Sequence, residues 1–253
     1  MAGLELIAIR FLLATARFTP VLAVPALTPF AFVPVFVRLA LLLAVGLLTA
    51  GVAPVQTGLA GIDQPIALGV ALLGEMAMGL TLALAVVLPG AAIGMAANVV
   101  DVQSGASAVS IFNPSMRTAE SMTGTAMQWV AALVFFALGL HLFLLRWVLA
   151  STRFAPLGSA FLAITPGAFV SLLGSQFLLG LAVVAPVILG LLGVDLAVAF
   201  ASRSMPQANI YFVALPLKIA AAFLLLAADL RYAPELIGRV YSQAFGAIST
   251  GGP

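Results

Sequence analysis

The sequence predicts an all-α integral membrane protein built from about six long helices, several of them kinked at prolines. The composition is the first indication, because 64% of the 253 residues are hydrophobic and the mean hydropathy is +1.25. Charge is the second: 7% of the residues are charged, against about 25% in a soluble domain. Uncharged stretches long enough to span a bilayer also recur, at 39–62, 76–100, 121–145 and 154–194.

We expect a single membrane domain over residues 1–253, with a loose C-terminal tail at 237–253. In its N-terminal part, residues 4–18 are predicted as a short apolar helix and residues 38–53 as the first long span. Between them, prolines remove backbone N–H donors and so oppose a regular helix. These prolines are Pro20, Pro25, Pro29 and Pro34.

The second predicted span covers residues 66–88, and its helix resumes after Pro89. Residues 104–115 break the apolar pattern with small residues and end in Asn-Pro, a turn signal. A long helix is predicted at 117–149. A span at 177–200 carries a proline that is expected to kink it, and the last span covers 210–228.

Several classes of function are excluded by what the sequence lacks. The net charge is only +2 and no run of Lys or Arg occurs, so nucleic-acid binding has no electrostatic basis. The chain has no cysteine, and the lone His141 is not part of an HExxH motif. A Gly-x-Ser-x-Gly motif is also missing. Thiol catalysis and cysteine-based metal sites are therefore excluded, and zinc and serine-hydrolase chemistry are disfavoured.

Charged residues inside apolar stretches are informative because each costs a few kcal/mol at a bilayer centre. Glu75, Asp195 and Lys218 lie in such surroundings. They fit either an ion relay in a transporter or buried ion pairs and protein–protein contacts; the second interpretation is favoured because their spacing assembles no coordination shell. An aspartyl protease that pairs Asp101 with Asp195 is disfavoured, because the Gly-x-Gly-Asp arrangement is missing.

The most specific pattern lies between Asp195 and Lys218. It consists of an Arg, a Pro-Gln pair, an Asn two residues later, an aromatic residue and a Pro in the final span: Arg203, Pro206, Gln207, Asn209, Phe212 and Pro216. This segment resembles the signature of the FliR/SctT family, the export-gate subunits of bacterial flagella and of virulence type III secretion. Arg17, Pro20 and Arg38 resemble the family's proline-rich connector and first long span. Asp195 departs from the family pattern, which usually has Asn there.

The resemblance implies a single copy of this chain in a complex with several copies of FliP-like and FliQ-like membrane subunits, alongside FlhB-like and FlhA-like components. Unfolded export substrates pass through this complex. The resemblance implies a mechanism without catalysis, so we expect a non-enzymatic protein with no catalytic residues, no cofactor and no metal site. It is expected in the bacterial inner membrane, within the basal body of the export apparatus and displaced toward the periplasm. Glu75, Asp195, Arg203 and Lys218 then need not face lipid, because partner subunits cover them.

The resemblance also implies that the loop between the middle helices plugs the closed channel. Small residues suit a segment that folds into a narrow lumen, and Ile111 with Phe112 offers apolar bulk against water and ions. Asn113 replaces the family's more usual Asp. The predicted plug residues are Gly105, Ala106, Ser107, Ala108, Val109, Ser110, Ile111, Phe112, Asn113 and Pro114.

Two alternatives to a flagellar export subunit stay open. An SctT-type subunit of a virulence secretion system shares the same signature. A small-molecule or ion transporter is a weaker alternative, because transporters often show two related halves around a midplane site, whereas this sequence has no evident internal repeat.

Overall fold

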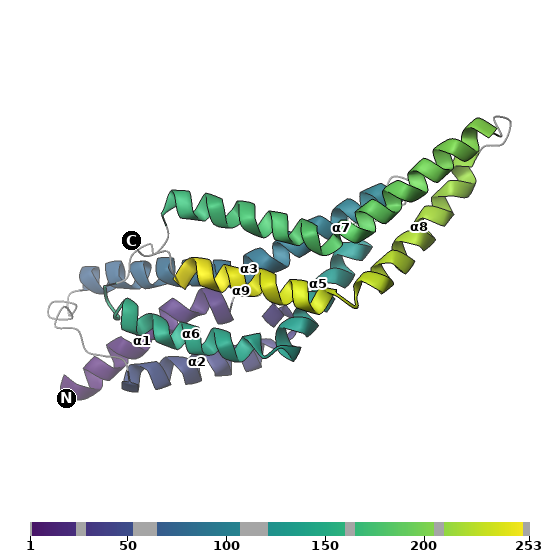
Figure 1. The fold of residues 1–253 in the computed structure, drawn as a ribbon. Helices are drawn as coiled ribbons and strands as arrows, with labels where there is room; N and C mark the ends of the chain where they lie inside the picture. Colours follow the sequence, from purple (N-terminus) through teal and green to yellow (C-terminus); the bar gives the residue numbers. More distant parts are fainter. Residues whose placement is uncertain are drawn as a thin grey trace. The chain divides into compact units, whose positions relative to one another are not determined.

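The computed structural model describes residues 2–23, 29–52, 65–106, 121–159, 165–204 and 210–249. Within these ranges, all regular secondary structure is helical (Figure 1). The predicted all-α fold class is therefore confirmed. In chain order the elements are α1 (Ala2–Leu22), the 3-10 helix η1 (Pro29–Phe32), α2 (Val35–Val52), α3 (Pro65–Ser104), α5 (Met122–Ala137), α6 (Leu140–Phe154), α7 (Pro166–Ser204), α8 (Ile210–Asp229) and α9 (Ala233–Ser249).

The number of described helices that could span a membrane differs from the six long helices that the sequence predicts. Three helices, α2, α3 and α7, are long and apolar enough to cross a membrane. Two further pairs, α5 with α6 and α8 with α9, pass the same test together, but each pair is bent by 71°. The described part of the chain thus offers three spans, or up to five if each bent pair counts as one.

The predicted continuous helix at 117–149 is wrong, because the chain breaks between α5 and α6. Gly139 adopts a φ of 68°, a left-handed conformation that glycine reaches without the strain a Cβ atom would cause. Its N–H donates to the carbonyl oxygen of Phe136 at 3.1 Å, which closes the end of α5. A search for apolar stretches passes over this break, because apolar residues flank the glycine on both sides.

Three prolines lie inside helices: Pro20 against the prediction, Pro89 where a resumed helix was expected, and Pro186 inside its predicted span. Helix α1 continues through Pro20 to Leu22, beyond its predicted end at 18. Helix α3 includes Pro89, and α7 includes Pro186. A proline inside a helix removes one backbone hydrogen bond, and neighbouring groups in a packed membrane bundle re-satisfy the freed carbonyl.

The predicted loose tail also differs from the structure, since α9 covers residues that were expected to be irregular. Its apolar residues follow the spacing of one helical face and are buried: Ile237, Val240, Tyr241, Ala244 and Phe245. The opposite face carries an exposed ion pair between Glu235 and Arg239 at 2.7 Å. A criterion based on uncharged length misses such an amphipathic helix.

The described helices group into two compact units. Unit 1 comprises Met1–Leu88, Phe135–Leu173 and Tyr241–Pro253, and unit 2 comprises Pro89–Val134 and Gly174–Val240. Each unit combines segments that are distant in the sequence. The single domain therefore stays a prediction.

The core of unit 1 combines packed helices with an aromatic cluster. Helix α1 packs against α2. Phe135 lies edge-on to Phe30 and Phe136, with ring centroids 6.0 and 5.5 Å away, and Tyr241 of α9 lies 5.1 Å from it. Such aromatic pairs contribute about 0.5–1.5 kcal/mol each beyond the area they bury. This cluster fixes the start of η1, the end of α5 and α9 around one centre.

In unit 2, glycines allow close approach between long helices. A Cβ atom on Gly180 of α7 would lie 2.7 Å from the backbone of Ala92 in α3. A Cβ atom on Gly190 would lie 2.6 Å from Leu225 of α8. Small residues at such crossings let helix backbones pack tightly in membrane proteins. Helices α7 and α8 form a hairpin that is visible in Figure 1.

We expect the Gly139→Ala variant to lose about 1–2 kcal/mol of stability, because the new Cβ is strained at positive φ. Gly69→Ala in α3 is the matched control, since neither glycine has an atom within 4 Å of a built Cβ. That control should be neutral or gain up to about 1 kcal/mol. The midpoints of thermal unfolding of the full-length chain within its assembled complex in detergent measure the difference. Equal midpoints for the two variants would show that the break does not depend on the left-handed glycine.

Candidate functional site

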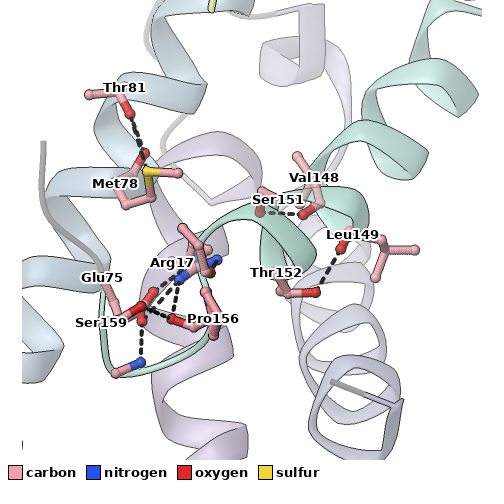
Figure 2. A network of polar contacts seen from close by, with 12 residues as sticks. Arg17, Glu75, Met78, Thr81, Val148, Leu149, Ser151, Thr152, Pro156 and Ser159 are labelled. Carbon is pink, nitrogen blue, oxygen red and sulfur yellow. Dashed lines mark hydrogen bonds and ion pairs between the residues drawn. The ribbon is translucent and has the colours of Figure 1, made fainter. Parts of the chain in front are cut away.

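Arg17 of α1 and Glu75 of α3 form an ion pair inside unit 1, and both side chains are 0% exposed. The Arg17 Nε donates to Glu75 Oε2 at 2.5 Å, and Nη2 donates to Oε1 at 3.0 Å. The pair is therefore bidentate, which is the strongest geometry for a guanidinium and a carboxylate. Figure 2 shows the two side chains facing each other across the helices.

The segment that follows α6 completes this network. Arg17 Nη1 donates to the carbonyl oxygen of Ala155 at 2.6 Å. The N–H of Gly158, whose φ is 90°, donates to Glu75 Oε1 at 2.8 Å. A buried ion pair is tolerated when further hydrogen bonds satisfy its remaining donors and acceptors. The network thus joins three segments of unit 1: α1, α3 and the residues after α6 (Figure 2).

One turn after Glu75, Gly79 brings α3 into direct contact with α1. A Cβ atom at this position would overlap the carbonyl oxygen of Arg17 and lie 3.0 Å from Pro20 Cδ. Pro20 itself is buried in the last turn of α1. A side chain at position 79 would therefore separate the two helices that carry the ion pair.

A second buried arginine connects α2 to the end of α1. Arg38 is 7% exposed, and its Nη1 donates to the carbonyl oxygen of Ala23 at 3.2 Å. Arg10 makes a comparable contact to the carbonyl oxygen of Ala50 at 3.4 Å. The arginines of the N-terminal helices thus bind backbone carbonyls inside unit 1.

In unit 2, Asp195 of α7 and Lys218 of α8 form an ion pair of 2.7 Å. It is only partly covered: the aspartate side chain is 39% exposed and the lysine side chain 19%. The neighbours Leu196 and Leu217 are also exposed. The α7–α8 hairpin therefore presents a charged pair within an otherwise apolar surface.

The predicted site residues that the structure describes are divided between the two units. Arg17, Pro20, Arg38 and Glu75 lie in unit 1, whereas Asp195 and Lys218 lie in unit 2. Arg203 is exposed in the last turn of α7, and Pro216 is exposed within α8. The remaining signature positions, Pro206, Gln207 and Asn209 with the side chain of Phe212, lie outside the described residues.

Of the predicted plug loop, the structure describes the first two residues. Gly105 has a φ of 81° and follows the end of α3, and Ala106 lies in the same turn. A Cβ atom on Gly105 would lie 2.7 Å from Leu215 Cδ1, so the base of the loop contacts α8. The other predicted plug residues lie outside the described ranges: Ser107, Ala108, Val109, Ser110, Ile111, Phe112, Asn113 and Pro114.

Sequence reasoning missed one polar cluster next to that loop. Asp101 is 4% exposed in the last turn of α3. Its Oδ2 accepts hydrogen bonds from the Ser121 hydroxyl and from the Thr123 N–H. Ser121 directly precedes α5, and serine is a preferred residue at a helix N-cap, but the predicted helix began before it. Within the described ranges, no three His, Asp or Glu side chains gather as metal ligands.

Large apolar side chains are exposed along many of the helices. Phe36 of α2 is 86% exposed, and Leu47 on the same helix is 62% exposed. Soluble monomers rarely expose contiguous apolar patches of this kind. These faces are suited to contact with lipid or with other apolar protein surfaces.

Removing one partner of the buried pair, as in Arg17→Met or Glu75→Leu, should cost about 3–5 kcal/mol, because a charge is then buried without compensation. The double variant should cost less than the sum, since it leaves no unpaired charge. Glu235→Gln in the exposed pair of α9 is the control and should change stability by at most about 1 kcal/mol. Thermal unfolding of the chain within its assembled complex in detergent checks this double-mutant cycle. Strict additivity of the two substitutions would contradict the coupling.

Comparison with known proteins gives relatives that are named for flagellar biosynthesis and for protein secretion systems. The flagellar biosynthetic protein FliR of Bacillus subtilis is 29% identical over 156 residues, which is 60% of this chain and 60% of that protein. The Yop proteins translocation protein T of Yersinia pestis is 30% identical over 156 residues, covering 60% of this chain and 59% of that protein. The secretion system apparatus protein SsaT of Salmonella typhimurium is 26% identical over 164 residues, covering 63% of this chain and 62% of that protein.

These alignments span about three fifths of the length of the relatives. A broader match comes from the profile of the family described as bacterial export proteins, family 1, which covers residues 8–244. The matched region includes α2, α3, α5, α6, α7 and α8 in full. The resemblance of the signature segment to the FliR/SctT family is therefore confirmed, and the chain belongs to the bacterial export proteins, family 1.

Proposed function

We propose that this chain is a non-enzymatic subunit of the bacterial type III protein export gate, which forms and gates the export channel in flagellar assembly. Family membership and relatives named for flagellar biosynthesis support this proposal. A virulence secretion system is the second candidate, because the Yersinia relative is similar to the same extent.

One structural observation carries the proposal: apolar helices that are too long for a bilayer. Helices α3 and α7 contain 40 and 39 residues, a contour of about 60 Å at 1.5 Å per residue. The hydrocarbon core of a bilayer is only about 30 Å thick. Each helix thus has about twice the roughly 20 residues that one crossing needs.

Large parts of these two helices therefore lie beyond the lipid tails, yet they expose apolar side chains along their length. Leu80 and Met95 are exposed on α3, and Leu189 and Leu196 on α7. Apolar surface outside lipid has to be covered by protein to avoid water. We infer that FliP-like and FliQ-like subunits provide that cover, in a complex that holds one copy of this chain.

The partly exposed Asp195–Lys218 pair supports the same inference. A charged group that faces lipid tails costs several kcal/mol, whereas a neighbouring subunit or a water-filled lumen solvates it. The pair lies on the α7–α8 hairpin, beside exposed leucines. This surface is therefore suited to an assembled complex better than to lipid alone.

In this proposal, the complex resides in the inner membrane within the basal body, displaced toward the periplasm. FlhB-like and FlhA-like components act beside it, and unfolded export substrates pass through its channel. The loop from Gly105 to Pro114 occludes the closed channel. Its small residues fit a narrow lumen, and Ile111 with Phe112 provides an apolar seal.

The proposal is tested in bacteria that lack their own copy of this chain. The wild-type chain should restore protein export without increasing the ion leak across the inner membrane. Deletion of residues 105–112 should raise the leak, because the apolar seal is lost. Deletion of residues 53–60, which removes the same length from the connection between α2 and α3, is the control and should leave the leak unchanged. An unchanged leak after the first deletion would contradict the plug, and a failure of the wild-type chain to restore export would contradict the export function.

A further inference from the structure

One carboxylate joins the two ends of the segment between α3 and α5. Asp101 belongs to the last turn of α3, and its Oδ2 accepts a hydrogen bond from the Ser121 hydroxyl at 2.5 Å. The same oxygen accepts the N–H of Thr123, in the first turn of α5, at 3.1 Å. Residues that stand 20 and 22 positions apart in the chain are thus linked through a single side-chain atom.

Ser121 and Asp101 together cap the start of α5. The Ser121 hydroxyl oxygen accepts the N–H of Gly124 at 2.7 Å, which is the usual bond of a helix N-cap serine. The same hydroxyl donates a hydrogen bond to Asp101 Oδ2, so the carboxylate holds the capping serine in place. A negative charge is favourable at a helix N-terminus, where backbone N–H groups leave partial positive charge.

The end of α3 is fixed at the same place. The Ser104 hydroxyl donates to the carbonyl oxygen of Asp101 at 3.2 Å and accepts the N–H of Ala106 at 3.4 Å. Gly105 then leaves the helix in a left-handed conformation, and its N–H donates to the Val102 carbonyl oxygen at 3.2 Å. The last described residues before the segment and the first described residues after it therefore belong to one hydrogen-bonded cluster.

The other carboxylate oxygen of Asp101, Oδ1, does not contribute to these contacts. Its Oδ1 is buried and accepts no hydrogen bond within the described part of the chain. A buried acceptor without a partner is destabilising, and the described ion pairs do not include Asp101. The carboxylate therefore stabilises this cluster only through the two hydrogen bonds that Oδ2 accepts.

We propose that Asp101 is a positioning residue, a clamp that holds the end of α3 and the start of α5 at one point. The clamp stands on described contacts alone and does not rest on the proposed function. Loss of the carboxylate releases Ser121 and Thr123 from α3, so the two helix ends separate.

The clamp is tested by spin labelling of the full chain in its assembled complex. The chain contains no cysteine, so Val102→Cys with Met122→Cys gives one clean pair of labels. Both positions are well exposed, at 69% and 72%, and flank the clamp on either side. Dipolar coupling between the labels reports the distance between the two ends. Hydrogen exchange of the first turn of α5 reports the cap.

Asp101→Ala removes both acceptors and should weaken the dipolar coupling. It should also speed exchange at Thr123 and Gly124 by about ten- to hundredfold, the range expected when a bond to a charged group is lost. Asp101→Asn keeps one acceptor of similar shape and should give a smaller change of the same sign. Asp229→Asn is the matched control, since Asp229 is also a buried aspartate in the last turn of a helix of unit 2. It should change neither readout.

Two outcomes decide the clamp. If Asp101→Ala and Asp101→Asn leave both the coupling and the exchange at their wild-type values, the clamp is overturned. A weaker coupling with faster exchange in Asp101→Ala, and a smaller change of both in Asp101→Asn, supports it.

Discussion

A polar group that water cannot reach must find its partner inside the protein, and this constraint organises the described helices. Arg17 and Glu75 satisfy it as a fully buried, bidentate pair that also binds the backbone after α6. Asp195 and Lys218 pair with each other, partly exposed, within an apolar hairpin, and Asp101 finds partners for one of its two oxygens at the start of α5. Each of these contacts joins segments that are far apart in the sequence, so the few charged residues determine which helices lie together.

The same constraint connects the fold to the proposed role. A chain with so few charged residues cannot cover its own surface for contact with water, and its longest helices exceed the thickness of the lipid tails. Apolar faces that lie beyond the lipid then need protein neighbours. The scarcity of charged residues therefore indicates surroundings other than water. In the proposed export gate, these surroundings are lipid and partner subunits.

Much of the fold could be predicted because its causes are local in the sequence. Uncharged apolar length indicates α2, α3, α7 and α8, and the signature around Arg203 and Pro216 points to the family. The break at Gly139 could not be predicted, because its left-handed conformation leaves no mark in hydropathy. Helix α9 could not be predicted either, because the charged residues on its exposed face interrupt the apolar length that marks the other helices.

The candidate site was harder to predict than the fold, because its contacts depend on tertiary structure. Glu75 stands out in the sequence as a charge in an apolar span, but nothing local identifies Arg17 as its partner. Gly79 matters only because the α1 backbone lies against it. Asp101 was considered for a catalytic pair with Asp195, and its bonds to Ser121 and Thr123 became evident only from the packing of α3 and α5.

The central claim is that partner subunits cover the exposed apolar faces of this chain. The most direct measurement is the native mass of the tagged chain, purified in detergent after expression alone and after co-expression with FliP-like and FliQ-like proteins. The account predicts an unstable, aggregating chain in the first case. In the second it predicts a defined complex with one copy of this chain and several copies of each partner. A stable, monodisperse monomer that binds neither partner would contradict it.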